Sequence, residues 1–161
     1  YEIDEDDDIQ EAYAIEDDED FFKTTSFPIH QDEDKGVLTK YQCLLRRQII
    51  VFVAGRNELE RKPGRGRRTC IQFGQVGIRC RHCGHSYYAQ SFDTLYAQAQ
   101  HMARGHLPEK CVLVDARTCA ELARLCQVSQ PKWGSGVKYW SERLREMGVY
   151  DDEGCLRVRN T

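Results

Sequence analysis

Two short motifs constrain this sequence more than any other feature. Cys80 and Cys83 are separated by two residues, and His106 and Cys111 follow with four residues between them. A C-x2-C pair lets one tight turn direct both sulfur atoms at the same ion. Three thiolates and one imidazole then complete a tetrahedral zinc site with no open position, which is the arrangement of a structural site. The spacing therefore predicts one structural Zn²⁺ held by Cys80, Cys83, His106 and Cys111.

The fourth ligand is the least determined member of this set. His101 lies about one helical turn before His106, and His85 follows the C-x2-C turn, so either could replace His106. Ordinary buried or surface thiols in a reducing compartment are the alternative to a metal site. Redox proteins also carry C-x2-C, but such a pair stands where a strand passes into a helix. Here a strand-like run over residues 71–79 leads into the motif, and residues 84–86 continue as a turn, which favours zinc.

The charge of the chain is divided between two regions. Residues 1–34 contain fifteen acidic residues and one lysine, whereas residues 35–161 contain eleven acidic and twenty-two basic residues, so the regions carry net charges of −14 and +11. Few apolar side chains are available in the first region to offset the entropy of ordering it. We therefore expect a disordered acidic arm over 1–34, followed by a basic zinc-binding domain over 35–161. The arm is either a solubilising tail, an activation-type segment with interspersed aromatic residues, or a segment that folds back on the basic domain and masks it.

The remaining cysteines fit a reducing compartment. We find no signal peptide and no apolar run long enough to span a bilayer, so we expect an intracellular, nuclear protein with no membrane partner. Small core residues are the favoured interpretation of these thiols, and a second metal site that uses Cys119 and Cys126 is the alternative. The thiols concerned are Cys43, Cys70, Cys119, Cys126 and Cys155.

The first folded element is predicted as a helix over residues 39–55. Thr39 and Gln42 form a capping box, and apolar residues then recur near helical spacing as far as Phe52. This helix is a candidate contact for a protein partner or for dimerisation. After the strand-like run, Tyr87 and Tyr88 are expected in a return strand, and a helix capped by Ser91 or Asp93 should reach Arg104.

The C-terminal part, residues 112–161, is expected to be helical. Thr118 and Glu121 are predicted to form a capping box for a helix through Gln127. A second helix runs from Val137 to Met147 with Trp140 in the core, Gly148 ends it, and residues 149–150 and 156–158 pair beyond it. The predicted fold is thus a small, mostly helical α+β domain with a short β-hairpin and zinc knuckle, in which residues 70–111 form the finger core.

Basic residues gather in the loop over positions 56–69 and around the C-x2-C motif. The loop is rich in glycine and arginine, a composition that suits phosphate contacts, minor-groove insertion and nuclear import. We expect these side chains to contact nucleic acid, most simply DNA. The candidates are Arg61, Lys62, Arg65, Arg67 and Arg68 in the loop, and Arg79 and Arg81 beside the cysteines.

Several runs resemble a group of uncharacterised zinc-finger-like proteins of diatoms and related algae. They are L-T-K-Y-Q-C-L-L-R-R-Q-I, G-Q-V-G-I-R-C-R-H-C, L-Y-A-Q-A-Q-H-M, H-L-P-E-K-C and G-V-K-Y-W-S-E-R-L-R-E-M-G-V, and together they extend the likeness over residues 37–158. The resemblance implies that Cys80, Cys83, His106 and Cys111 occupy the group's recurring positions, and that His101 stands where the group tends to carry Asn. The segment from 84 to 90 departs from the group's longer, more basic linker. A weaker likeness to BED-type DNA-binding fingers also covers the knuckle and the following helix.

These observations lead to one expected function and two alternatives. We expect a zinc-binding, nucleic-acid-binding domain of a nuclear protein that regulates transcription. A zinc-scaffolded protein-interaction module, acting through the arm or the helix at 39–55, is the first alternative. No phosphate-binding glycine loop or catalytic signature of the G-x-S-x-G or H-E-x-x-H type is present. We therefore expect no enzyme, and a metal-dependent nuclease built on His82, His85 and Asp93 is the second alternative.

Overall fold

The computed structural model describes residues 26–55, 71–128 and 135–159, and these residues form a mixture of helices and antiparallel strands. The main sheet has four strands in the order β1-β2-β3-β4, and a separate two-stranded hairpin pairs β5 with β6. The predicted α+β class is confirmed. The strands are β1 (Phe27–Pro28), β2 (Ile49–Val53), β3 (Val76–Cys80), β4 (Ser86–Tyr88), β5 (Val149–Asp151) and β6 (Leu156–Val158).

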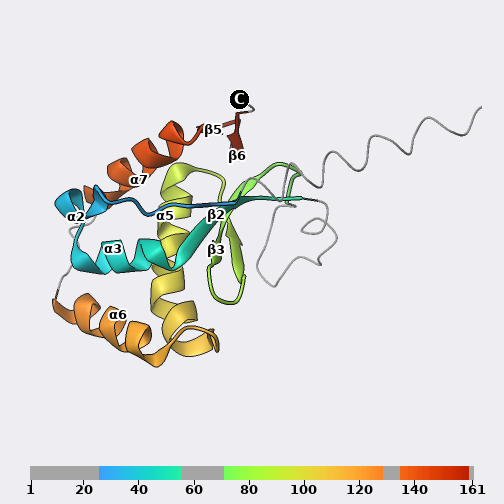
Figure 1. The fold of residues 1–161 in the computed structure, drawn as a ribbon. Coiled ribbons are helices and arrows are strands. Elements are labelled where there is room, and N and C mark those ends of the chain that lie inside the picture. Colours follow the sequence, from blue (N-terminus) through green and yellow to red (C-terminus); the bar gives the residue numbers. More distant parts are fainter. Residues whose placement is uncertain (1–25, 56–70, 129–134, 160–161) are drawn as a thin grey trace, which may run out of the picture.

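Helices pack beside the sheet and against one another (Figure 1). One long helical stretch, formed by α5 and η1, contacts β3 and β4 with its first half and also contacts α7, while α3 and α6 lie side by side. The residue after this stretch, Cys111, lies close to the end of β3, with its sulfur 3.8 Å from that of Cys80. The helices are α2 (Asp34–Val37), α3 (Lys40–Arg47), α5 (Phe92–His101), the π-helical η1 (Met102–Lys110), α6 (Ala116–Val128) and α7 (Ser135–Glu146).

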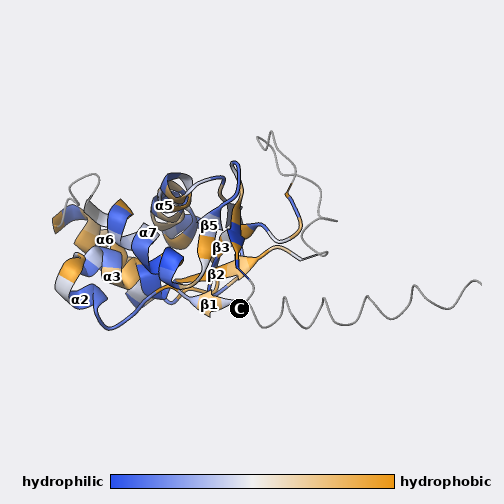
Figure 2. Ribbon diagram, turned by 90° about the horizontal axis from the view of Figure 1, so that it is seen from above, coloured by the Kyte–Doolittle hydropathy of each residue, from blue (hydrophilic) through white to orange (hydrophobic). Residues whose placement is uncertain are grey.

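The pairing of β2 with β3 positions the first candidate ligand, Cys80. Ile49 pairs with Cys80 and Val51 with Ile78, all four of which are buried. The ribbon of β2 is mostly hydrophobic along its length (Figure 2). One face of this strand pair packs into the core, and this fixes the register of the pair. The register holds Cys80, the last residue of β3, opposite Ile49.

The first helix is shorter than predicted. The capping box at Thr39 is confirmed, because its side chain accepts from the Gln42 backbone and the Gln42 side chain accepts from the Thr39 backbone. The helix ends at Arg47, however, and the run I-I-V-F-V that follows is strand β2, so the prediction of helix over 39–55 is wrong in its second half. β-branched and aromatic side chains favour a strand where partner strands are available, and helical spacing of the apolar residues concealed this change.

The predicted boundary of the acidic arm is also wrong at its C-terminal end. β1 pairs with β2, and Ile29 is fully buried, so residues 27–34 belong to the folded domain. Asp34 forms a buried ion pair with Arg46, whose Nε lies 2.8 Å from the carboxylate. The charge of Asp34 is compensated inside the domain rather than repelled by its neighbours. The rest of the predicted arm, residues 1–25, lies outside the described residues.

Arg46 connects three parts of the chain. Its Nη2 donates to the Ile29 carbonyl over 2.7 Å, and its guanidinium lies 4.9 Å from the Trp140 ring centre. Tyr139 donates its hydroxyl to the second Asp34 oxygen over 2.9 Å. The segment before α2, helix α3 and helix α7 therefore meet at one buried cation.

The remaining elements follow the sequence with small differences. Ser91 caps α5, the return strand β4 contains Tyr87 and Tyr88, and the β5–β6 hairpin is present. Trp140 is buried as predicted, with its ring edge-on to Tyr96 at 5.5 Å. The start of α6 was predicted wrongly, because the Asp115 carboxylate, not Thr118, accepts the capping bond, and the helix begins at residue 116.

Candidate metal centre

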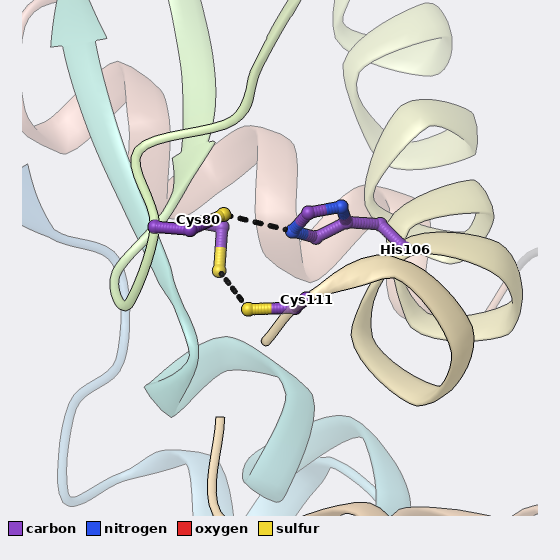
Figure 3. Close-up of side chains that lie close together, drawn as sticks. Cys80, His106 and Cys111 are labelled. Carbon is purple, nitrogen blue, oxygen red and sulfur yellow. Dashed lines mark hydrogen bonds between the residues drawn. The ribbon is translucent and has the colours of Figure 1, made fainter. Parts of the chain in front are cut away.

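Two segments far apart in sequence bring the four predicted ligands together. Cys80 ends β3 and Cys83 lies in the turn to β4, whereas His106 lies in η1 and Cys111 directly follows it. Figure 3 shows His106 and Cys111 directed from the helical segment toward Cys80. The four ligand atoms all lie within 4.8 Å of one another, a separation at which one ion can contact all of them.

The distances agree with a tetrahedral metal site. The sulfur atoms of Cys80 and Cys111 are 3.8 Å apart, and the Cys83 sulfur is 3.1 Å from Nε2 of His106. Zinc bonds of about 2.3 Å to sulfur and about 2.0–2.1 Å to nitrogen place tetrahedral ligands about 3.8 Å (S···S) and about 3.6 Å (S···N) apart. The two sulfurs already have this separation, and the Cys83–His106 pair needs to open by roughly half an ångström to admit the ion.

The turn after β3 has the backbone of a metal knuckle. Gly84 has a φ of +78° and donates its backbone N–H to the Cys80 carbonyl over 2.9 Å. The same turn directs the His85 backbone N–H at the Cys83 sulfur over 3.5 Å. This N–H···S contact fixes the Cys83 sulfur in the turn, beside the His106 ring.

The π-helical geometry of η1 explains why His106 and Cys111 can share an ion. In an α-helix each residue turns about 100°, so side chains five positions apart diverge by about 140°. In η1 the Cys111 backbone N–H bonds the His106 carbonyl over 2.8 Å, an i→i+5 bond that closes a wider turn. The wider turn places the side chains of positions i and i+5 on the same side of the helix. The π-helix is therefore the helix type in which an H-x4-C pair can face one ion.

Burial and backbone hydrogen bonds act differently on the two facing thiols. Burial raises the pKa of Cys80 to about 11, although backbone groups of Cys83 and His82 act in the opposite direction. Burial also acts to raise the pKa of Cys111, but hydrogen bonds from the Leu113 and Val114 backbone help to bring it below its usual value. Cys111 therefore ionises first, and a metal must displace the proton of Cys80 when it binds.

His106 is prepared for the neutral form that a metal requires. Burial lowers its pKa, and His85 and Lys110 lower it further. Only 5% of His106 is exposed, and the ring of His85 stacks on it at 4.6 Å with 15° between the planes. The cluster thus contains His106, while the two alternative ligands lie beside it: His85 covers the ring of His106, and His101 contacts the edge of Tyr87.

The predicted nucleic-acid contacts are only partly covered by the described residues. Arg81 is exposed in the knuckle turn, and Arg79 stacks over Phe52, with 3.9 Å from its guanidinium carbon to the ring centre. Arg79 therefore packs on the sheet. The five basic loop residues lie outside the described residues: Arg61, Lys62, Arg65, Arg67 and Arg68.

The other cysteines stay apart from the cluster. Cys155 is buried, as expected for a small core residue, and the Cys119 thiol donates to the Leu107 carbonyl over 3.3 Å. Within residues 26–55, 71–128 and 135–159, no second group of cysteines, histidines or carboxylates has the spacing of a metal site. Cys70 lies outside these ranges.

The backbone donors at Cys111 and the stacking of His85 were not anticipated from the sequence. The H-x4-C spacing was the available signal, but it does not specify a helix type. Hydrogen bonds from backbone N–H groups cannot be predicted from the residue types alone. His82 also has an unpredicted contact, with its Nε2 2.7 Å from the Gln48 side-chain oxygen. This contact ties the knuckle turn to the end of α3.

Comparison with known proteins does not assign the chain to a family. No family model, curated protein or solved structure matches it. Among the described helices, none combines the length and the apolar character needed to cross a bilayer. The chemistry of the cluster is therefore the basis on which a function can be argued.

Proposed function

We propose that the chain is a zinc-stabilised nucleic-acid-binding module of a nuclear regulatory protein, with DNA as its first candidate ligand. The observation that supports it most is the closed set of three sulfurs and one imidazole nitrogen. Thiolate and imidazole ligands in a tetrahedral arrangement suit zinc. Four protein ligands leave no position for a substrate, so the ion would hold the knuckle to the end of η1 and take no part in a reaction.

Native mass spectrometry of reduced protein tests the zinc site. We expect one Zn²⁺ per chain, lost with a chelator and absent from Cys80→Ser and His106→Ala. Cys126→Ser is the matched control, since this thiol lies outside the cluster, and it should keep the ion. His85→Ala and His101→Ala should also keep it. Reduced protein without any bound zinc would contradict the proposal.

Positive charge beside the site supports the nucleic-acid part of the proposal. Arg81 in the knuckle and Lys110 at the end of η1 are exposed, and the net charge over residues 35–161 is +11. Each phosphate contact releases counterions, so affinity for duplex DNA should fall steeply between about 50 and 200 mM salt. Arg81→Ala and Lys110→Ala should each reduce the slope of log K against log salt by about 1.

Lys138→Ala serves as the control for these variants. The Lys138 side chain is 85% exposed on α7, and its Nζ lies 3.8 Å from the Glu142 carboxylate. It carries the same charge as Arg81 and Lys110 but lies on a different element from the metal cluster. A slope unchanged in the Arg81 and Lys110 variants, or weak salt-independent binding, would contradict DNA recognition at this surface.

A protein-interaction module is the second candidate, favoured by the residues that follow Cys111. Val112 is 89% exposed and Leu113 is 62% exposed, directly beside the metal ligand. Exposed adjacent apolar side chains at a rigid position can serve as an anchor for a partner. Val112→Asp with Leu113→Asp should abolish capture of a protein partner and leave zinc content unchanged, whereas the DNA proposal predicts little change in DNA affinity.

A further inference from the structure

A groove of about 410 Å³ lies where α2, α3 and α6 meet, apart from the metal cluster. Apolar side chains line its deeper part: Leu38 and Leu125 are buried, and Leu44 is half-buried. α3 and α6 form two of its walls and run side by side (Figure 1). An apolar concavity of this size can receive several side chains of an incoming segment.

The edge of the groove is basic. Lys35, Lys40 and Arg47 are exposed there, and none of them forms an ion pair with another described residue. The acidic residue in the lining is Glu121, and Arg124 binds both of its carboxylate oxygens over 3.0 and 2.6 Å. Lys40 is near enough to Glu121 to help lower the pKa of that carboxyl, but one carboxylate that is already bound to Arg124 cannot balance three cations.

A ligand for this groove needs apolar side chains spaced among carboxylates. The chain itself contains such a segment, because residues 1–25 include twelve acidic residues and one lysine. We propose that this acidic segment docks into the groove of its own chain, with apolar side chains on the leucines and carboxylates against Lys35, Lys40 and Arg47. The apolar residues available for this contact are Ile3, Ile9, Tyr13, Ile15, Phe21 and Phe22.

The length of the segment permits this contact within one chain. Twenty-five residues span at most about 80 to 90 Å when extended, whereas a compact domain of this size has a radius of gyration of only about 14 Å. Tethering also gives the segment an effective concentration in the millimolar range. Individually weak ion pairs and a few apolar contacts are therefore sufficient to keep it docked.

Docking would affect the basic domain in a definite way. The segment's charge would be held at the α2–α3–α6 surface, where it lowers the positive potential available to an external polyanion at low salt. Docking of the segment requires neither zinc binding nor DNA binding. Either of these proposed activities can therefore fail in experiment while the docking proposal stands.

Zero-length carbodiimide cross-linking of the full chain tests the contact directly. We expect amide cross-links from Lys35 or Lys40 to carboxylates within residues 1–25, with a yield independent of protein concentration. Lys110 and Lys138 are exposed lysines outside the groove and serve as controls. Cross-links that join these controls to the segment as often as Lys35 and Lys40 would overturn the proposal. A yield that rises with concentration would also overturn it, because it would indicate the segment of a second copy.

The thiol of Cys43 gives an independent measure, because it lines the groove. We expect its alkylation by iodoacetamide to accelerate several-fold when the ten acids at positions 4–8 and 16–20 are changed Asp→Asn and Glu→Gln. High salt should have the same effect on the unmodified chain. Cys126 lines a different groove beside η1 and should react equally in both chains. Equal Cys43 rates in the two chains at low salt would overturn the proposal.

Discussion

The buried ion pair between Asp34 and Arg46 gives the sharpest prediction for stability. Replacing Asp34 with Ala leaves the Arg46 guanidinium without its carboxylate at a position where its side chain has no exposed surface. The same change removes the acceptor of the Tyr139 hydroxyl. Breaking a buried pair in this way costs about 3–5 kcal/mol, because the desolvated charge is left uncompensated.

Urea unfolding in the presence of Zn²⁺ measures this effect. With a slope of about 1–3 kcal/mol per molar urea for a domain of this size, Asp34→Ala should lower the midpoint by at least about 1 M. The double variant Asp34→Ala with Arg46→Met should recover much of the loss, since it removes the stranded charge as well.

Glu121→Ala is the control for the buried pair. Glu121 is exposed and bound to Arg124 on the surface, where an ion pair has little effect on stability, so its midpoint should not change measurably. The reasoning is wrong if Asp34→Ala behaves like this control. It is equally wrong if the double variant loses the sum of the two single losses, because the two side chains would then not be coupled.

Three further predictions concern packing and pH. Gly77→Ala should strongly lower the melting temperature, because a Cβ there would lie 2.6 Å from the Tyr87 carbonyl oxygen. Gly36→Ala is the control: a Cβ there has no neighbour within 4 Å, so thermal unfolding should show a neutral or slightly stabilising effect. Trp140→Ala should cost about 3–5 kcal/mol by chemical denaturation because it empties a buried site, and a loss under about 1 kcal/mol would contradict its place in the core. The pKa of His106 is lowered in the folded protein, so below about pH 6.5 the unfolded chain binds more protons than the folded one. The free energy of unfolding should therefore fall as the pH decreases below about 6.5. Thermal melting of His106→Gln at several pH values checks this, because the variant should lack the pH dependence that His106 contributes.

The ligand set was predictable from sequence, while the geometry that completes it was not. Cysteine and histidine spacing reflects what one ion requires, so the four residues that the structure gathers within 4.8 Å could be named without a fold. The wider turn of η1 depends on i→i+5 backbone hydrogen bonds, and the bond between positions 106 and 111 is one of them. No residue type encodes such a bond, and the sequence therefore indicated only a helix end.

The change from α3 to β2 shows a different limit. The apolar residues between Tyr41 and Phe52 fit helical spacing, but Ile49 to Val53 pair with β3, a strand more than twenty residues later in the chain. A local pattern carries no information about a distant partner strand. The Asp34–Arg46 pair was missed for the same reason. Asp34 follows an acidic run and was assigned to the disordered arm, because the sequence does not show that Arg46 would neutralise it inside the fold.

The π-helical turn makes the site sensitive to chain length as well as to residue type. Each hydrogen-bonded turn of η1 contains one residue more than a turn of α-helix. Deleting a single residue between His106 and Cys111 would let the segment relax to an ordinary α-helix, with an i→i+4 bond in place of the present one. The side chains of Glu109 and Lys110 are exposed, so substitutions there should leave the register intact, whereas a deletion alters where Cys111 points. In this segment the number of residues, as well as their identity, determines whether the four side chains of the cluster can meet.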